Sequence, residues 1–261
     1  MIRCAGLLML AAAAFQEGGA VAGPKQGVVP LFNGKDLTGL STWLKDTKGE
    51  DPRKVFTVHD GMIHASGDGM GYVATANEYR DYRLVVEYKW GTRTDGGKYV
   101  RNSGLLLHAG RDGEAGNGAW APSIEVQLAQ GCEGDLIGIR GKDPLTLTVE
   151  TVLGPDKRLR WKKGGTPTVY SGKQFWWSNH DPGFKELLDT RGKDDVASPP
   201  AEWTRVEAVC EGKRLAIFVN DVQVNEAIEV SPASGRILLQ CEGHEVFFRK
   251  VELHPLPEKK P

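Results

Sequence analysis

The chain has 261 residues, which is enough for one large domain or two small ones. Lys and Arg total 33 against 34 Asp and Glu, so the net charge is −1 and no basic field exists to hold nucleic acid or an anionic membrane. Gly is abundant, at 33 residues, which is typical of a chain with many turns between short strands.

The first 22 residues have the pattern of a secretory signal peptide. Arg3 precedes an apolar run from Ala5 to Phe15, and Ala20-Val21-Ala22 provides a small-residue cleavage site. The run is too short to span a bilayer, and Cys4 stands before it rather than after it, which argues against a lipid anchor. We expect cleavage near Ala22, or alternatively after Ala14, and export of the remaining chain to the periplasm or beyond without a membrane anchor.

Strand patterns dominate the remaining chain. Val55 to Val58 and Met62 to Ala65 flank Asp60-Gly61, a pair that suits a tight hairpin turn. Further strands are predicted, in chain order, at Tyr82 to Trp90, Gly104 to His108, Ser123 to Leu128, Trp203 to Cys210, Arg214 to Asn220, Val222 to Asn225, Arg236 to Cys241 and Glu245 to Leu253. Many short strands with turns between them predict an all-β protein, a sandwich or jelly roll of two antiparallel sheets.

Two segments depart from this pattern. A short helix is predicted near Phe184 to Asp189, and residues 154–200 read as a long irregular segment, which is usually functional or mobile. We expect one domain over residues 23–255, followed by a tail over residues 256–261.

The stretch from Ser123 to Asp135 carries the most informative pattern. Period two places Ile124, Val126 and Leu128 on one face of a strand, fit for a core. The other face carries Glu125 and Gln127, a carboxylate and an amide roughly 7 Å apart. A polar row on the open face of a sheet can hold a sugar, and an ordinary solvated strand face is the alternative.

Export would leave three cysteines, Cys132, Cys210 and Cys241, an odd number that permits at most one disulfide within the chain. Cys210 and Cys241 both end predicted strands, which makes them the better pair. The alternative is that all three are small buried hydrophobic residues.

Several segments, in their order and spacing over about residues 30 to 255, together resemble the 3-keto-disaccharide hydrolase domain family. They are Leu31 to Leu37, Asp60-Gly61, Tyr82 to Trp90, Asn102 to His108, Ser123 to Leu128 with Gly134-Asp135, Pro200 to Trp203, Val219-Asn220, Leu239 to Gly243 and Phe248-Arg249. The chain departs from the family at Asp221, where such domains often carry Gly, and over residues 154–200. The resemblance implies a concanavalin A-like β-sandwich that cleaves glycosides whose sugar has been oxidised to a ketone at C3.

A C3 ketone acidifies the neighbouring C2–H, so a base can remove that proton and the C1 substituent can leave by β-elimination. The chemistry needs a general base, an acid for the leaving oxygen and donors for the developing enolate. Water addition afterwards gives net hydrolysis. The paired carboxylates of an ordinary glycosidase are not required.

Three side chains are candidates for the catalytic groups. Glu125 is the first candidate for a base or acid, and Glu87, on the face opposite its strand's apolar residues, is the second. His108 also projects opposite its strand's leucines and could shuttle a proton near neutral pH. The alternatives are solvated surface carboxylates and a hydrogen-bonded structural histidine. The same three residues could also hold a divalent metal if the fold brought them together, so metal dependence is left open.

Amides and aromatic rings are the candidates for substrate binding. Asn102, Gln127 and Gln240 lie on or beside predicted strands and could bind sugar hydroxyls or the ketone, or could satisfy backbone groups at strand ends. Loop residues Trp120, Trp176 and Trp177 could stack on a sugar, or could fill gaps at the edge of the sandwich.

Two other functions use the same pattern. A non-catalytic lectin-like module would suit the fold and the loop aromatics. A β-glucanase is disfavoured, because the chain has Gln127 and Gln130 where the Glu-x-Asp-x-x-Glu strand of such enzymes carries its second and third acids. The oligomeric state is left open.

Overall fold

The computed structural model describes residues 20–257. The predicted signal peptide therefore lies outside the described residues, except at its cleavage site, where β1 (Val21–Ala22) pairs in parallel with β7 (Tyr79–Arg80). Within the described residues, no helix is long and apolar enough to cross a membrane.

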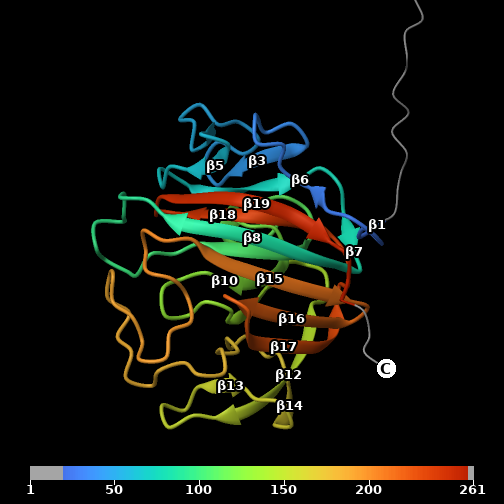
Figure 1. The fold of residues 1–261 in the computed structure, drawn as a ribbon, viewed down its shortest axis with the longest axis vertical. Coiled ribbons are helices and arrows are strands. Elements are labelled where there is room, and N and C mark those ends of the chain that lie inside the picture. Colours follow the sequence, from blue (N-terminus) through green and yellow to red (C-terminus); the bar gives the residue numbers. More distant parts are fainter. Residues whose placement is uncertain (1–19, 258–261) are drawn as a thin grey trace, which may run out of the picture.

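Two large antiparallel sheets make up the fold (Figure 1). The six-stranded sheet has the order β11-β10-β9-β18-β6-β3, from β3 (Leu40–Leu44), β6 (Met70–Thr75), β9 (Gly104–Ala109), β10 (Ser123–Gln127), β11 (Leu136–Ile139) and β18 (Arg236–Glu242). The eleven-stranded sheet has the order β13-β12-β17-β16-β15-β8-β19-β5-β4, with β14 on β12 and β2 on β19. Its strands are β2 (Val29–Pro30), β4 (Phe56–His59), β5 (Met62–Ala65), β8 (Tyr82–Trp90), β12 (Thr146–Leu153), β13 (Leu159–Trp161), β14 (Thr166–Val169), β15 (Thr204–Glu211), β16 (Arg214–Val219), β17 (Val222–Ser231) and β19 (Val246–His254).

The main core lies between the two sheets, because alternating apolar residues of each sheet face the other. Ile124 and Val126 of β10 and Leu84 and Val86 of β8 are buried in the same apolar cluster. The predicted all-β sandwich of two antiparallel sheets is therefore confirmed. Each sheet also has an outer face, and the polar residues that alternate with this core project from one outer face or the other.

The predicted helix at Phe184 to Asp189 is not formed. Residues 181–190 make isolated turns instead, such as the Phe184 N–H to Asp181 carbonyl bond, and Asp189 is tied to Arg101 by an ion pair of 2.7 Å. A stretch this short cannot offset the cost of helix nucleation. Within the described residues, helical structure is confined to the turn η1 (Gly116–Gly118).

The long segment from residue 154 is less irregular than expected, since β13 and β14 form a hairpin that extends the eleven-stranded sheet; the rest, up to β15, is loop. Cys132, Cys210 and Cys241 are all free and buried. The predicted disulfide between Cys210 and Cys241 is thus not formed, and the alternative of small buried residues holds.

Candidate functional site

Two side chains on the outer face of the six-stranded sheet close over a glycine. Glu125 projects from β10 and Gln240 from β18, and Gly104 lies on β9 between these strands. A Cβ on Gly104 would lie 2.4 Å from Glu125 Oε1 and 3.1 Å from Gln240 Oε1. The missing side chain at Gly104 therefore allows the carboxyl and the amide to approach each other across β9.

A second carboxyl, that of Glu242, lies on the same face. Alternation along β18 places Leu239 and Cys241 in the main core, so Gln240 and Glu242 project outward. Asn102 Nδ2 donates a hydrogen bond to Glu242 Oε2 at 2.9 Å. We call Asn102, Glu125, Gln240 and Glu242 the carboxyl–amide cluster.

Several buried polar atoms of this cluster have no hydrogen-bond partner among residues 20–257. They are Asn102 Oδ1, Glu125 Oε1 and both side-chain amide atoms of Gln240. Glu125 is 5% exposed and Gln240 is 1% exposed, and buried polar atoms are nearly always hydrogen-bonded in folded proteins. Unpaired donors and acceptors gathered at one place make this cluster the candidate functional site.

Both carboxyls of the cluster hold a proton more tightly than ordinary glutamates. Burial, and then the neighbouring charge of Glu242, raise the pKa of Glu125 to about 8. Burial raises the pKa of Glu242 to about 7. Near neutral pH the two groups therefore share about one proton, so one can act as an acid while the other acts as a base.

Aromatic residues cover the adjoining part of this outer face. Gln240, Tyr72 and Trp43 are opposed in register across β18, β6 and β3. The Tyr72 hydroxyl donates to Asp112 Oδ1 at 2.8 Å, and Trp43 Nε1 donates to the Gly118 carbonyl at 3.0 Å. These bonds hold residues 110–121 over the aromatic pair, so this loop borders the carboxyl–amide cluster on one side.

Gln127 and Trp120, both predicted to bind substrate, have structural contacts. Gln127 Oε1 accepts hydrogen bonds from the backbone N–H groups of Leu128 and Ala129 at 3.0 and 3.1 Å, so it satisfies the backbone where β10 ends. Trp120 is half-buried and packs against the apolar cluster around Tyr72.

Glu87 lies on the opposite surface of the sandwich. Because Val86 points into the main core, Glu87 projects from the outer face of the eleven-stranded sheet. Arg249 Nε and Lys250 Nζ lie 2.6 and 2.8 Å from its carboxylate oxygens. Burial alone would raise the pKa of Glu87, but the bonds from Lys250 and Arg249 outweigh it and hold the pKa below the ordinary value. Glu87 is an ionised structural carboxylate and does not meet Glu125.

A β-bulge turns His108 away from the cluster. β9 has one residue more than β18 between two of their register pairs, and His108 has a φ of 53°. The ring meets Tyr82 of the other sheet edge-on at 6.1 Å, and Nδ1 bonds to the Pro232 carbonyl at 2.9 Å. Burial lowers the pKa of His108 to about 4, so the ring is neutral at neutral pH. The predicted trio of Glu125, Glu87 and His108 is therefore not assembled.

The two neighbouring tryptophans of the long loop are held by the protein itself. Trp177 is 2% exposed in the main core, and its Nε1 donates to the Gly131 carbonyl at 3.1 Å. Trp176 is half-buried, with the Arg158 guanidinium 3.8 Å and the His180 ring 4.3 Å from its ring centroid. Trp177 is thus a core residue rather than a sugar platform.

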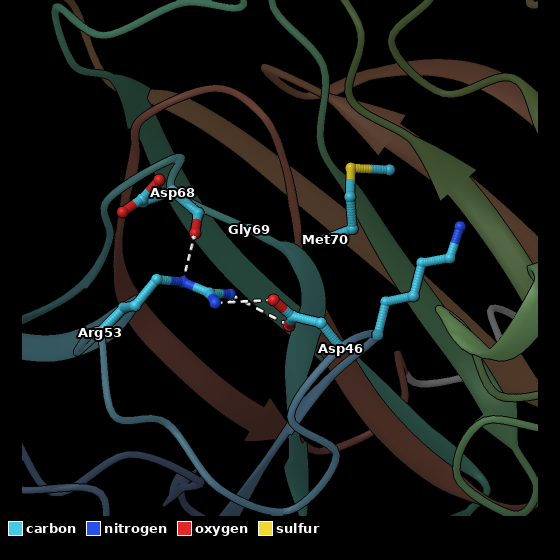
Figure 2. A pocket seen from close by; sticks show the side chains of 6 residues that line it. Asp46, Arg53, Asp68, Gly69 and Met70 are labelled. Atoms are coloured by element: carbon cyan, nitrogen blue, oxygen red, sulfur yellow. Dashed lines mark hydrogen bonds and ion pairs between the residues drawn. The ribbon is translucent and has the colours of Figure 1, made fainter.

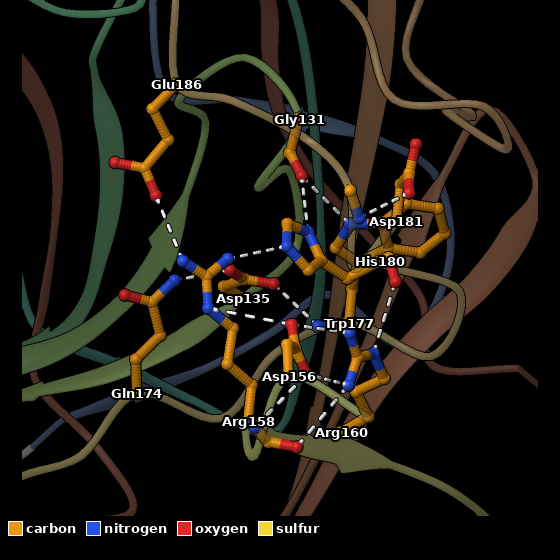
Figure 3. Close-up of polar contacts among 11 residues, drawn as sticks. Gly131, Asp135, Asp156, Arg158, Arg160, Gln174, Trp177, His180, Asp181 and Glu186 are labelled. Atoms are coloured by element: carbon orange, nitrogen blue, oxygen red, sulfur yellow. Dashed lines mark hydrogen bonds and ion pairs between the residues drawn. The ribbon is translucent and has the colours of Figure 1, made fainter. Parts of the chain in front are cut away.

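A charged network fastens this loop to the turn that follows β10 (Figure 3). Arg160 of β13 makes two hydrogen bonds to Asp156, at 2.7 and 2.8 Å. Arg158 Nη1 donates to His180 Nε2 at 2.8 Å, which leaves the proton of the ring on Nδ1, where it bonds to the Gly131 carbonyl at 3.0 Å. We call these five residues the loop clamp.

Two more contacts hold the same loop near the cluster. Asp135, buried at the end of the turn after β10, accepts the backbone N–H of Trp177 at 2.6 Å. Arg101, next to Asn102, pairs with Asp189 at 2.7 Å. The loops over residues 91–103 and 170–203 accordingly gather at one end of the sandwich (Figure 1).

The residues expected to hold a divalent metal do not come together, because Glu87 and Glu125 lie on opposite outer faces. Within residues 20–257, no group of three or more His, Cys, Asp or Glu side chains is arranged to hold a metal ion.

The structure adds one carboxyl that the sequence interpretation missed. The predicted strand ended at Cys241, one residue before Glu242, although the alternation of Leu239 and Cys241 with Gln240 continues to Glu242. Tyr72 and Trp43 were missed because no strand was predicted at either position.

Comparisons with known proteins agree with this fold. The model of the 3-keto-alpha-glucoside-1,2-lyase-like domain family matches residues 27–254. A predicted glycosyl hydrolase from Parabacteroides distasonis, solved at 1.70 Å, is 18% identical with a TM-score of 0.51, covering 88% of this chain and 95% of that one. A second such structure from the same organism, at 2.00 Å, is 17% identical with a TM-score of 0.50, covering 88% of this chain and 100% of that one. Among curated proteins, none matches the chain.

Proposed function

Because this chain belongs to the 3-keto-alpha-glucoside-1,2-lyase-like domain family, we propose that it cleaves 3-keto-glycosides by β-elimination on the outer face of the six-stranded sheet. The observation that carries the proposal is the carboxyl–amide cluster, in which two carboxyls with raised pKa values lie beside buried amide atoms without partners. The reaction needs an acid, a base and enolate donors, and the cluster supplies each of these.

Glu125 acts as the base in this proposal and Glu242 as the acid. The higher pKa of Glu125 makes its carboxylate the stronger base, and the lower pKa of Glu242 makes its carboxylic acid the stronger acid. Glu125 removes the C2 proton, and the C2–H electrons form an enolate with the C3 oxygen. The enolate then collapses, the C1–O bond breaks, and the leaving oxygen takes a proton from Glu242. The products are a C1=C2 enone and a free alcohol, and water addition to the enone completes hydrolysis.

The amides stabilise the developing charge. The Gln240 amide makes no hydrogen bond of full geometry, although it lies close enough to Glu125 to lower the pKa of that carboxyl. Its buried N–H pair is suited to donate to the C3 oxygen as the enolate forms. Asn102 Nδ2 already donates to Glu242 Oε2, which leaves Glu242 Oε1 to carry the transferred proton. Asn102 therefore orients the acid, while Gln240 stabilises the enolate.

Incubation of the purified protein with a 3-keto-α-glucoside disaccharide tests the proposal. We expect release of reducing sugar with transient ultraviolet absorbance from the conjugated enone, and no release from the same disaccharide without the ketone. Equal cleavage of the unoxidised disaccharide would contradict the elimination chemistry. Binding of oligosaccharide without any turnover would instead indicate a lectin-like module.

We also propose that the protein is exported, on the support of the apolar run from Ala5 to Phe15 and the small residues at Ala20 to Ala22. Cell fractionation with mass spectrometry of the mature N-terminus tests this, and recovery of an uncleaved chain from the cytoplasm would contradict it.

A further inference from the structure

Met70, which pairs with Glu242 in the six-stranded sheet, lines a cavity of about 590 Å³, which we call the Arg53 cavity (Figure 2). It is lined by Lys45, Asp46, Arg53, Asp68, Gly69 and Met70. Its volume falls in the ~300–1,000 Å³ range of small-molecule sites. We propose that this cavity is the subsite for the leaving sugar; this inference rests on the proposed function.

The register of the sheet places the cavity next to the proposed acid. Met70 of β6 is directly opposite Glu242 of β18, so both side chains lie on the same outer face with Cβ atoms about 5 Å apart. Met70 is 36% exposed. Glu242 protonates the leaving oxygen, so the group attached to that oxygen has to extend from Glu242. The Arg53 cavity lies one strand away in the direction of Met70.

Fixed polar groups in the cavity match the hydroxyls of a sugar. Arg53 donates to both oxygens of Asp46, at 2.6 and 3.1 Å, and from Nε to the Asp68 carbonyl at 3.1 Å. Of the five guanidinium N–H groups, two therefore stay available, and the carboxylates keep acceptor capacity. A Cβ at position 69 would touch the guanidinium, at 3.4 Å from Arg53 Nη2. Gly69 has no Cβ and so leaves the guanidinium uncovered. Met70 adds an apolar surface for the C–H face of a ring.

The paired charges at the cavity favour a neutral sugar over an aromatic leaving group. Lys45 and Arg53 contribute two positive charges, and Asp46 and Asp68 contribute two negative charges. Arg93 Nη2 lies 2.7 Å from Asp68 Oδ1, so both carboxylates are paired with guanidinium groups. A flat aromatic group would cover the two available guanidinium N–H groups and the carboxylate oxygens without hydrogen-bonding to them, at a cost in desolvation. Sugar hydroxyls donate and accept, and so they satisfy both kinds of group.

Kinetics with two substrates test the subsite. The kcat/KM of the wild-type chain, Arg53→Gln and Met70→Ala is measured on a 3-keto-disaccharide and on a methyl 3-keto-α-glucoside, which lacks the leaving sugar. We expect Arg53→Gln to lose about tenfold on the disaccharide, as for hydrogen bonds to a charged group, and Met70→Ala to lose about tenfold through the lost apolar contact. Both variants should stay within twofold on the methyl glycoside. Arg214→Gln removes a similar ion pair on the eleven-stranded sheet, with Glu226 at 2.6 Å, and should change neither value.

A binding measurement separates this inference from the reaction itself. Free hexose is titrated into the wild-type chain while the amide NMR shifts of Asp46, Gly69 and Met70 are followed. We expect saturable shifts that Arg53→Gln abolishes. If these shifts occur but no 3-keto substrate is cleaved, the proposed reaction fails and the sugar subsite stands. Equal losses on both glycosides, or unchanged kinetics on the disaccharide, overturn the subsite, as does the absence of hexose-dependent shifts.

Discussion

Glu125 and Glu242 have different roles in the proposed reaction, and a good leaving group can tell them apart. A 4-nitrophenolate leaves without protonation, so it needs the base but not the acid. We expect Glu125→Gln to lower kcat at least 100-fold on both a 3-keto-disaccharide and a 4-nitrophenyl 3-keto-glucoside. Glu242→Gln should lower kcat to a similar extent on the disaccharide and less than about fivefold on the nitrophenyl substrate. Nitrophenolate absorbance and reducing-sugar release measure the two rates.

A structural control for these variants is Glu87→Gln, because Glu87 lies on the opposite outer face, paired with Arg249 at 2.6 Å. It should leave both rates within twofold of wild type. If the nitrophenyl substrate rescues Glu125→Gln instead of Glu242→Gln, the two roles are reversed.

The buried carboxyl of Glu125 also makes stability depend on pH. Its pKa rises from 4.5 in the unfolded chain to about 8 in the fold, through burial and the nearby Glu242 charge. The unfolded chain therefore releases this proton first, so the associated stability is complete below pH ~4.5 and is lost as pH rises toward 8. We expect Glu125→Gln to raise Tm relative to wild type, by a gain that grows between pH 5 and pH 8. A Tm difference that does not change with pH in calorimetry would contradict the buried carboxyl.

At the scale of single residues, alternation predicts the face of a side chain as long as the strand is regular. Glu125 and Gln240 project from the outer face because Ile124, Val126 and Leu239 fill the core. His108 follows the same pattern in the sequence but lies after a bulge, whose extra residue inverts the alternation. Its left-handed φ depends on tertiary packing, so the local sequence pattern does not predict it.

Strand β9 separates Glu125 from Gln240, and its glycine sets how closely they approach. Gly104→Ala would place a Cβ 2.4 Å from Glu125 Oε1, so the carboxyl has to move out of position. We expect kcat/KM to fall at least tenfold, because small displacements of a catalytic group are costly. Gly49→Ala is the matched control, since nothing lies within 4 Å of a Cβ there. Wild-type kinetics in Gly104→Ala would contradict the proposed place of Glu125 in the reaction.

The loop clamp joins β13 to the turn after β10, and its ion pair is partly buried. The Arg160 side chain is 7% exposed and that of Asp156 is 16% exposed. Asp156→Asn leaves the guanidinium without its counter-charge, so we expect the free energy of unfolding to fall by about 2–3 kcal/mol. Urea denaturation measures the loss. The control is Glu229→Gln, which breaks the ion pair with Lys213, whose side chains are 66% exposed for Lys213 and 70% exposed for Glu229. It should lower the free energy of unfolding by less than about 0.5 kcal/mol.

Among the elements, long alternating strands were predictable and short paired ones were not. Tyr82 to Trp90 matches β8 residue for residue, because nine alternating residues leave little ambiguity. β13 is three residues long and is defined by its pairing with β12, so its own sequence carries little signal. The helix predicted at Phe184 to Asp189 depended on the same weak local evidence, and contacts with distant residues such as Arg101 decided its conformation.

For the whole molecule, the sequence indicated two faces for each strand but could not assign strands to sheets. Glu87 and Glu125 both alternate with core residues, yet β8 and β10 belong to different sheets, so these carboxyls point to opposite outer surfaces. Glu242 joins Glu125 only because β9 pairs with both β10 and β18. Such pairings join strands that are far apart in the chain, and the alternation within each strand does not predict which strands pair.

The shared proton of the carboxyl–amide cluster predicts the pH profile of the enzyme as a whole. The active form carries one proton on the two carboxyls, whose pKa values are about 8 for Glu125 and about 7 for Glu242. Below this range the base is protonated, and above it the acid is ionised. We therefore expect kcat/KM on a 3-keto-disaccharide to follow a narrow bell with its maximum between pH 7 and 8.

In Glu242→Gln, assayed with the nitrophenyl substrate, the alkaline limb should disappear. The remaining acidic limb should then follow the titration of a single group, because Glu125 is the one carboxyl of the pair that is left to ionise. An unchanged bell in Glu242→Gln would show that the two carboxyls do not titrate as a pair.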